Sequence, residues 1–132
     1  MLEARLKEVP FFGSLTHKEL VFVGQQTDEL DVPAGKVLAK EGDLGREFFI
    51  VESGTAEVTK DGEHIADMGP GDFFGEIALV AEERRTATVT STSPMLLIVM
   101  SRASFRAIDR MLPEVHARVA KAIEDRRART AS

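Results

Sequence analysis

The spacing of apolar residues divides the chain into a helical start, a long middle stretch of strands and a helical end. At the start, Leu2, Leu6 and Val9 recur at helical intervals. Pro10 then ends the pattern, because a proline lacks the backbone N–H and clashes with the preceding turn of a helix. This arrangement predicts a short helix over residues 2–8.

A second short helix is predicted over residues 17–25. Thr16 and Glu19 have the spacing of a capping box, in which each side chain accepts a hydrogen bond from the other residue's backbone N–H. Apolar residues follow directly behind this pair. Together the two helices would form an N-terminal helical collar over residues 1–26.

From about residue 28 the apolar period shortens to two, and turn-forming residues recur at short intervals. Asp61-Gly62 gives the strongest hairpin signal, because a type I′ turn needs positive φ at both central positions. About eight short antiparallel strands over roughly 70 residues predict a jelly-roll-like β-roll over residues 27–101. The clearest strand candidates are residues 48–51, 56–59, 63–68, 86–90 and 95–99.

Helical periodicity returns after residue 101. Ser101 can cap a helix over residues 102–110, and Pro113 suits the first turn of another helix that runs to about residue 129. One face of this last helix is apolar and is formed by Val115, Val119, Ala122 and Ile123. Such a stripe is equally suited to docking on the roll and to a helix–helix dimer.

The composition is that of a soluble globular protein, with 43% hydrophobic and 30% charged residues among 132. This length suits one domain with a single core, which we place over residues 1–132. The net charge of −5 disfavours nucleic acid and anionic membranes as partners. No segment resembles a signal peptide or a membrane span, so a cytoplasmic location is expected.

Metal and thiol chemistry have little support. The chain has no cysteine, which excludes disulfides, thiolate nucleophiles and cysteine-based metal sites. The three histidines lack the spacing of a ligand pair, and a metal-dependent jelly-roll enzyme would need such a cluster. They are His17, His64 and His116.

Residues 73–89 interrupt the strand rhythm. Their apolar run predicts about one turn of helix over Glu76–Val80, introduced by Gly75, which lets a ligand approach the backbone closely. Backbone N–H groups at the start of the turn, together with Arg85, could bind a phosphate. A carboxylate beside an anion would need donors such as sugar hydroxyls. Alternatively, these residues form an ordinary turn and a solvated strand end.

The segment FGEIALVAEERRTATV closely resembles the phosphate-binding cassette of cyclic nucleotide-binding domains. These domains occur in catabolite-activator-like regulators, cAMP-dependent kinase regulatory subunits and cyclic-nucleotide-gated channels. The resemblance covers nearly the whole chain and implies a mainly β fold with flanking helices. An eight-stranded antiparallel β-roll, or double-stranded β-helix, would carry the cassette, residues 73–89, between its sixth and seventh strands. A hinge helix and a lid helix would follow over residues 102–130.

The resemblance also implies roles for individual cassette residues. Gly75 and Glu76 would hold the ribose 2′-OH of the nucleotide. Ile77 and Ala78 would offer backbone N–H groups near the cyclic phosphate, and Arg85 would neutralise that phosphate.

Other residues bear on the base. Thr86 could contact phosphate or base and occurs in relatives that accept cGMP, so cAMP and cGMP remain alternatives. Arg84 replaces a proline of some branches without disturbing the binding pattern, and we expect it at an exposed tip. Because the chain has no Tyr or Trp, an aliphatic wall would replace aromatic stacking. The segment GTAEVTKDGEHIADM resembles that wall, whose apolar contacts would be Val58, Ala66 and Met68.

The expected function is a non-catalytic sensor that binds cAMP or cGMP, uses no cofactor and repositions its C-terminal helices. A homodimer partner or an effector protein would dock on the last helix. Alternatively, the chain is the sensor domain of a longer transcription factor, channel or enzyme. The 132 residues themselves are expected to leave no room for a DNA-binding helix-turn-helix after the sensor. The apolar neighbours of the cassette helix are expected to be Phe105, Ile108, Met111 and Leu112.

Overall fold

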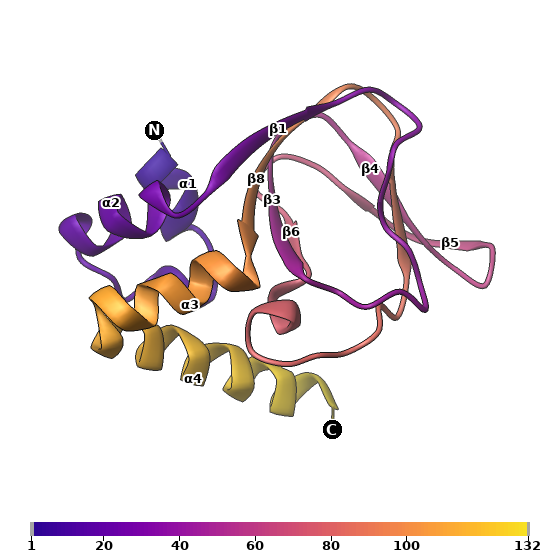
Figure 1. Cartoon of the computed structure of the whole chain (residues 1–132). Coiled ribbons are helices and arrows are strands. Elements are labelled where there is room, and N and C mark those ends of the chain that lie inside the picture. The colour runs from indigo at the N-terminus through magenta and orange to yellow at the C-terminus, as the bar shows by residue number, and fades with distance from the viewer. Residues whose placement is uncertain (1, 132) are drawn as a thin grey trace.

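The computed structural model describes the backbone of residues 2–131 and the side chains of residues 2–128, and within this range the fold is mainly β (Figure 1). Eight antiparallel strands form two sheets of four in the described residues. The strands are β1 (Asp28–Val32), β2 (Val37–Ala39), β3 (Glu47–Ser53), β4 (Ala56–Lys60), β5 (Glu63–Met68), β6 (Phe73–Phe74), β7 (Thr88–Ser91) and β8 (Met95–Ser101). The helices are α1 (Leu2–Lys7), η1 (Pro10–Phe12), α2 (His17–Gln25), η2 (Glu76–Leu79), α3 (Arg102–Met111) and α4 (Pro113–Ala131), of which η1 and η2 are 3₁₀-helices.

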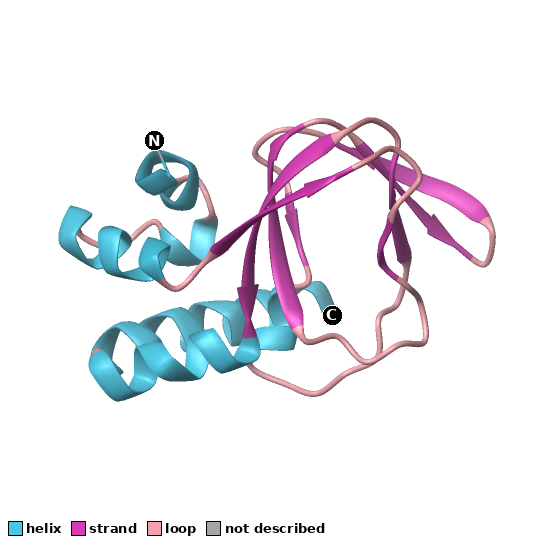
Figure 2. Ribbon diagram, turned by 45° about the horizontal axis from the view of Figure 1, so that its top comes forward, coloured by secondary structure: helices cyan, strands magenta, loops and turns pink. Residues whose placement is uncertain are grey.

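The predicted β-roll with flanking helices is confirmed. One sheet has the order β1-β8-β3-β6, and the other has the order β2-β7-β4-β5. Helices α1 to α4 gather on one side of the roll, and the β4–β5 hairpin projects on the opposite side (Figures 1 and 2). The cassette turn η2 lies between β6 and β7, as the resemblance implied.

Strand β3 shows why the roll and the helices pack as one body. Successive side chains of a strand point to opposite faces, and both faces of β3 are buried. Phe48 and Ile50 join the core beneath the helices. Phe49 and Val51 join a second core between the two sheets. The roll is therefore held against the helices by alternate residues of the same strand.

The helix starts follow their sequence signals. Thr16 and Glu19 form the predicted capping box, with N–H to side-chain distances of 3.2 and 2.9 Å. Ser101 caps α3 by accepting the Ser104 N–H at 3.1 Å. In the predicted hairpin turn, Asp61 and Gly62 have φ values of 53° and 83°, both positive as a type I′ turn requires.

The apolar face of α4 is buried within its own chain. Val115, Val119 and Ile123 are at most 1% exposed and belong to the core beneath the helices, where Ala122 is partly buried. Of the two alternatives for this face, the structure supports docking on the rest of the domain. None of the helices described here combines the length and the hydropathy needed to cross a bilayer.

Three local predictions need correction. The first helix ends at Lys7, and η1 follows it where no element was predicted. The strand predicted over residues 86–90 begins only at Thr88, because the preceding residues pair with another loop. Met111 is 67% exposed and is no neighbour of the cassette. It is the last residue of α3, and Leu112 continues the buried row instead.

Candidate functional site

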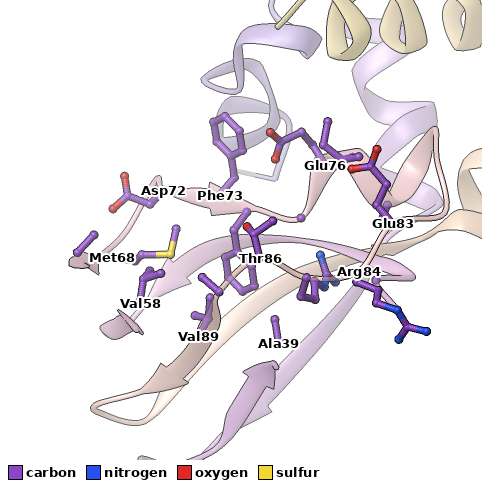
Figure 3. Close-up of a pocket in the computed structure, with 18 of the residues that line it drawn as sticks. Ala39, Val58, Met68, Asp72, Phe73, Glu76, Glu83, Arg84, Thr86 and Val89 are labelled. Carbon is purple, nitrogen blue, oxygen red and sulfur yellow. The ribbon is translucent and has the colours of Figure 1, made fainter. Parts of the chain in front are cut away.

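A cavity of about 570 Å³ lies between the sheet β2-β7-β4-β5 and the cassette (Figure 3). This volume falls in the range of roughly 300–1,000 Å³ that is usual for small-molecule sites. The structure brings every predicted site residue to its lining: Gly75, Glu76, Ile77, Ala78, Arg85, Thr86, Val58, Ala66 and Met68.

One wall of the cavity is an apolar row that crosses the whole sheet. Val58 is paired with Ala66 on one side and with Val89 on the other, and Val89 is paired with Ala39. Residues directly opposite each other on neighbouring strands point to the same face of a sheet. Met68 lies two residues beyond Ala66 and shares this face (Figure 3). We call these five residues the wall.

The guanidinium of Arg85 lies between two glycines. A Cβ at Gly75 would come within 2.5 Å of Arg85 Nη1, and one at Gly45 would come within 2.8 Å of Arg85 Cζ. Both positions therefore need glycine if the guanidinium is to stay in place. Gly75 also has a φ of 84°, which disfavours any residue with a side chain.

The electrostatics of Arg85 suit an anion. Its Nη2 donates to the backbone carbonyl of Glu47 at 2.7 Å. Burial lowers the pKa of the Arg85 guanidinium, while the carboxylates of Glu47 and Glu76 oppose this shift. An arginine stays protonated at neutral pH despite such a shift. The cavity thus contains a partly desolvated cation in a fixed position.

A backbone ladder fixes where the Arg85 side chain begins. The Arg85 N–H donates to Asp43 O at 2.7 Å, and its carbonyl accepts the Gly42 N–H at 2.8 Å. Next to it, the Gly45 N–H donates to Glu83 O at 3.0 Å. The loop between β2 and β3 therefore holds the end of the cassette.

The cassette turn η2 is a 3₁₀-helix, in which hydrogen bonds join residues three apart and the chain is wound more tightly than in an α-helix. Its Ala78 N–H donates to Gly75 O at 3.1 Å, inside the turn itself. Ala78 and Leu79 are buried, whereas Ile77 is partly buried against the core beneath the helices. The resemblance assigned the N–H groups of Ile77 and Ala78 to a phosphate. That role remains a prediction, and the Ala78 N–H already has a partner in the turn.

Glu76 and Phe73 point from the cassette toward α4 (Figure 3). The Glu76 side chain is 18% exposed, and its Oε1 lies 3.6 Å from Nε of Arg126 in α4. The Arg126 guanidinium also lies over the Phe73 ring, with Cζ 4.9 Å from the centroid. Arg126 lines the cavity, although the sequence did not identify it.

Thr86 and Arg84 lie at the rim of the cavity. Thr86 is exposed, just after Arg85. Arg84 is exposed too, and its side chain points away from the wall and donates to Gly42 O at 2.7 Å (Figure 3). The expectation that Arg84 lies at an exposed tip is confirmed.

Fold and site together define the class: a β-roll in which the cassette brings an arginine and a glutamate to a cavity whose other side is the apolar wall of a sheet. Residues 29–110 match the cyclic nucleotide-binding domain family, and the chain belongs to this family. The resemblance to this family, which was inferred from the sequence of the cassette, is thereby confirmed.

Similar proteins fall into more than one group. The cAMP-dependent protein kinase regulatory subunit of Yarrowia lipolytica is 39% identical over 110 residues, covering 81% of this chain and 29% of the relative. The regulatory domain of Toxoplasma gondii PKA, solved with cAMP, is 40% identical with a TM-score of 0.73, covering 81% of this chain and 42% of that one. The N-terminal domain of a Streptomyces coelicolor transcriptional regulator has a TM-score of 0.85 at 25% identity, covering 96% and 94%. The chain thus spans less than a third of the length of the kinase subunit.

Proposed function

We propose that the domain is a non-catalytic sensor that binds a purine 3′,5′-cyclic mononucleotide, cAMP or cGMP, in the cavity beside the cassette. The enclosed guanidinium of Arg85 carries this proposal. A positioned arginine can donate two parallel hydrogen bonds to the two free oxygens of a cyclic phosphate. The single negative charge of that phosphate matches one guanidinium, and an anionic partner offsets the cost of burying a cation.

The ribose would lie beside Glu76. A carboxylate only accepts hydrogen bonds, so it suits a sugar 2′-OH and repels a second phosphate. Gly75 would lie beside the sugar too, and its lack of a side chain leaves room for the Arg85 guanidinium. Ile77, Ala78 and Thr86 would complete the phosphate end of the site.

The base would lie against the wall. Val58, Ala66 and Met68 were predicted for this contact, and Ala39 and Val89 extend the same surface across the sheet. Apolar side chains attract the faces of a purine and do not read its edge. The wall would therefore accept the base of either cAMP or cGMP. Thr86 is the polar side chain that would influence which of the two binds more tightly.

The C-terminal helices would change position when the nucleotide binds. Leu79 of the cassette is buried in the same core as Phe105 and Ile108 of α3. Arg126 of α4 reaches the cavity itself. A ligand that binds one arrangement of these helices more tightly shifts the population toward it. The outer face of α4 would then meet an effector protein or a second copy.

The module could act alone over residues 1–132, or as the sensor of a longer transcription factor, channel or enzyme. In both cases its own role is binding without chemistry. The net charge of −5 favours a small, locally recognised anion over nucleic acid.

Calorimetric titration of ligand-stripped protein with cAMP, cGMP and 5′-AMP tests this proposal. We expect at least one cyclic nucleotide to bind more tightly than 5′-AMP, because a linear phosphate has more charge and a different shape. Arg84→Ala serves as a control: this side chain lies at the rim of the cavity, points away from the wall and donates to Gly42 O, so its loss should change affinity little. Equal affinity for 5′-AMP and both cyclic nucleotides would overturn the proposal.

A further inference from the structure

We propose that Arg102 is a positioning residue that joins the cassette to α3 and transmits nucleotide binding to the C-terminal helices. This inference rests on the function proposed above. Arg102 is the first residue of α3 and does not line the nucleotide cavity.

Arg102 contacts three places on the cassette at once. Its Nε donates to Ala78 O at 2.7 Å, and its Nη2 donates to Ala81 O at 2.5 Å. Its Nη1 lies 3.4 Å from the carboxylate of Glu82. The side chain is only 15% exposed, and hydrogen bonds from a charged donor are roughly twice as strong as neutral ones. The side chain thus holds the cassette backbone at two carbonyl groups, one within η2 and one two residues after η2 ends.

The backbone of Arg102 is fixed to the roll. Its N–H donates to Arg46 O at 3.0 Å, and the preceding Ser101 caps α3 at the end of β8. The side chain therefore connects the anchored first turn of α3 to the cassette. If the cassette shifts when a nucleotide binds, it must either move this first turn or break directional hydrogen bonds.

The apolar contacts between the same elements behave differently. Leu79 packs against Phe105 and Ile108 in the core, and such contacts have no preferred direction. They couple the positions of the cassette and α3 through close packing, but they do not fix the orientation of one relative to the other. A fork of hydrogen bonds to two carbonyl groups does, because its strength falls steeply with misalignment. Arg102 is thus the directional part of the connection.

The chain offers a matched control. Arg106 lies about one turn further along α3 and is exposed beside the same groove between the cassette and the helices. Arg102→Met and Arg106→Met both remove one guanidinium and keep an apolar stem. Arg102→Lys keeps the charge, but its single ammonium cannot reproduce the planar fork.

Two measurements test the proposal with cAMP and cGMP as probes: affinity by calorimetry, and amide exchange of α4 with and without nucleotide. We expect Arg102→Met to bind about tenfold more weakly and to lose most of the nucleotide-induced change in α4 exchange. Arg102→Lys should lie between this variant and the wild type. Arg106→Met should match the wild type in both measurements.

A merely structural role would lower the melting temperature of Arg102→Met and leave the nucleotide-induced change in α4 intact, and this outcome would overturn the proposal. If Arg102→Met does not fold, Arg102→Lys decides by the same criterion. If the wild type binds neither nucleotide, the proposed function fails and this inference fails with it. If the wild type binds and the variants respond fully, only the role of Arg102 is wrong.

Discussion

The wall and the cassette face each other across the cavity and are held in place by different kinds of interaction. The wall is a row of partners in a regular sheet, from Ala39 through Val89 and Val58 to Ala66. Val89 and Val58 lie in the two central strands and have paired strands on both sides, whereas Ala39 and Ala66 lie in edge strands and are paired on one side. The wall can therefore lose one side chain and keep its shape.

The cassette is held by a few specific contacts between side chains and backbone. Arg85 bonds to the carbonyl of Glu47 on the cavity side, and Arg102 bonds to two carbonyls on the helix side. Two further arginines, Arg126 and Arg127 of α4, pair with Glu76 and Glu83. Single substitutions should therefore have large effects on the cassette and small effects on the wall.

The largest effect is expected for Arg85→Ala. Losing one partner of a charge-assisted contact in a desolvated pocket costs about 2 to 5 kcal/mol, roughly 30-fold to several-thousand-fold in affinity. Calorimetry with cAMP and cGMP measures this loss. Arg84→Ala is the matched control and should bind like the wild type. A greater loss for Arg84→Ala than for Arg85→Ala would show that the assignment of the phosphate-binding arginine is wrong by one residue.

The next largest effect is expected for Gly75→Ala. A Cβ there would displace the Arg85 guanidinium and would lie 2.7 Å from Glu47 O, so affinity should fall about 10- to 100-fold, or roughly 1.4 to 2.7 kcal/mol. Gly62→Ala is the control, because Gly62 has nearly the same φ of 83° and no atom within 4 Å of the added Cβ. Urea denaturation should show that Gly62→Ala loses about 1 to 2 kcal/mol of stability through its positive φ, and that Gly75→Ala loses more, because its Cβ also overlaps Glu47 O. Equal losses of affinity would mean that the enclosure of Arg85 is not what matters.

A smaller effect is expected for Glu76→Ala. It removes an acceptor for the ribose 2′-OH, and a hydrogen bond to a charged group contributes about 1.5 kcal/mol, or roughly tenfold in affinity. The loss should nearly vanish when 2′-deoxy-cAMP replaces cAMP in the titration. Glu83→Ala controls for the loss of a carboxylate that pairs with α4. An equal loss with the deoxy ligand would assign Glu76 to helix contacts and not to the sugar.

The sequence predicted those parts of the fold and of the site that depend on local sequence. Strands, caps and the Asp61-Gly62 hairpin follow from local periodicity and turn chemistry, and the structure has them where these signals lie. Val58, Ala66 and Met68 were found because their hairpin segment resembles the strands that contact the base in the family. The cassette residues were found through resemblance, since they lie within one short segment.

What the sequence did not indicate depends on contacts between distant segments. Val89 joins the wall only because β7 pairs with β4, and Ala39 joins it only because β2 pairs with β7, about 50 residues further along the chain. Gly45 matters only because its loop pairs with residues 83–85, which also delays the start of β7. Arg126 reaches the cavity only through the path that α4 takes past the cassette. No local pattern could have revealed these three features.

The smallest effect is expected on the wall. Val58→Ala removes two methyl groups from a half-buried position, so affinity should fall by about 1 kcal/mol, roughly fivefold. Because the wall contacts the base and not the phosphate, the loss should be similar for cAMP and for 5′-AMP, whereas the loss in Arg85→Ala should fall chiefly on the cyclic ligand. Val37→Ala is the matched control, since Val37 lies on the same sheet, is 49% exposed and does not line the cavity. If Val58→Ala weakened cAMP binding as much as Arg85→Ala does, the wall would be as sensitive to single substitutions as the cassette, and the contrast between a redundant sheet and a cassette held by few contacts would fail.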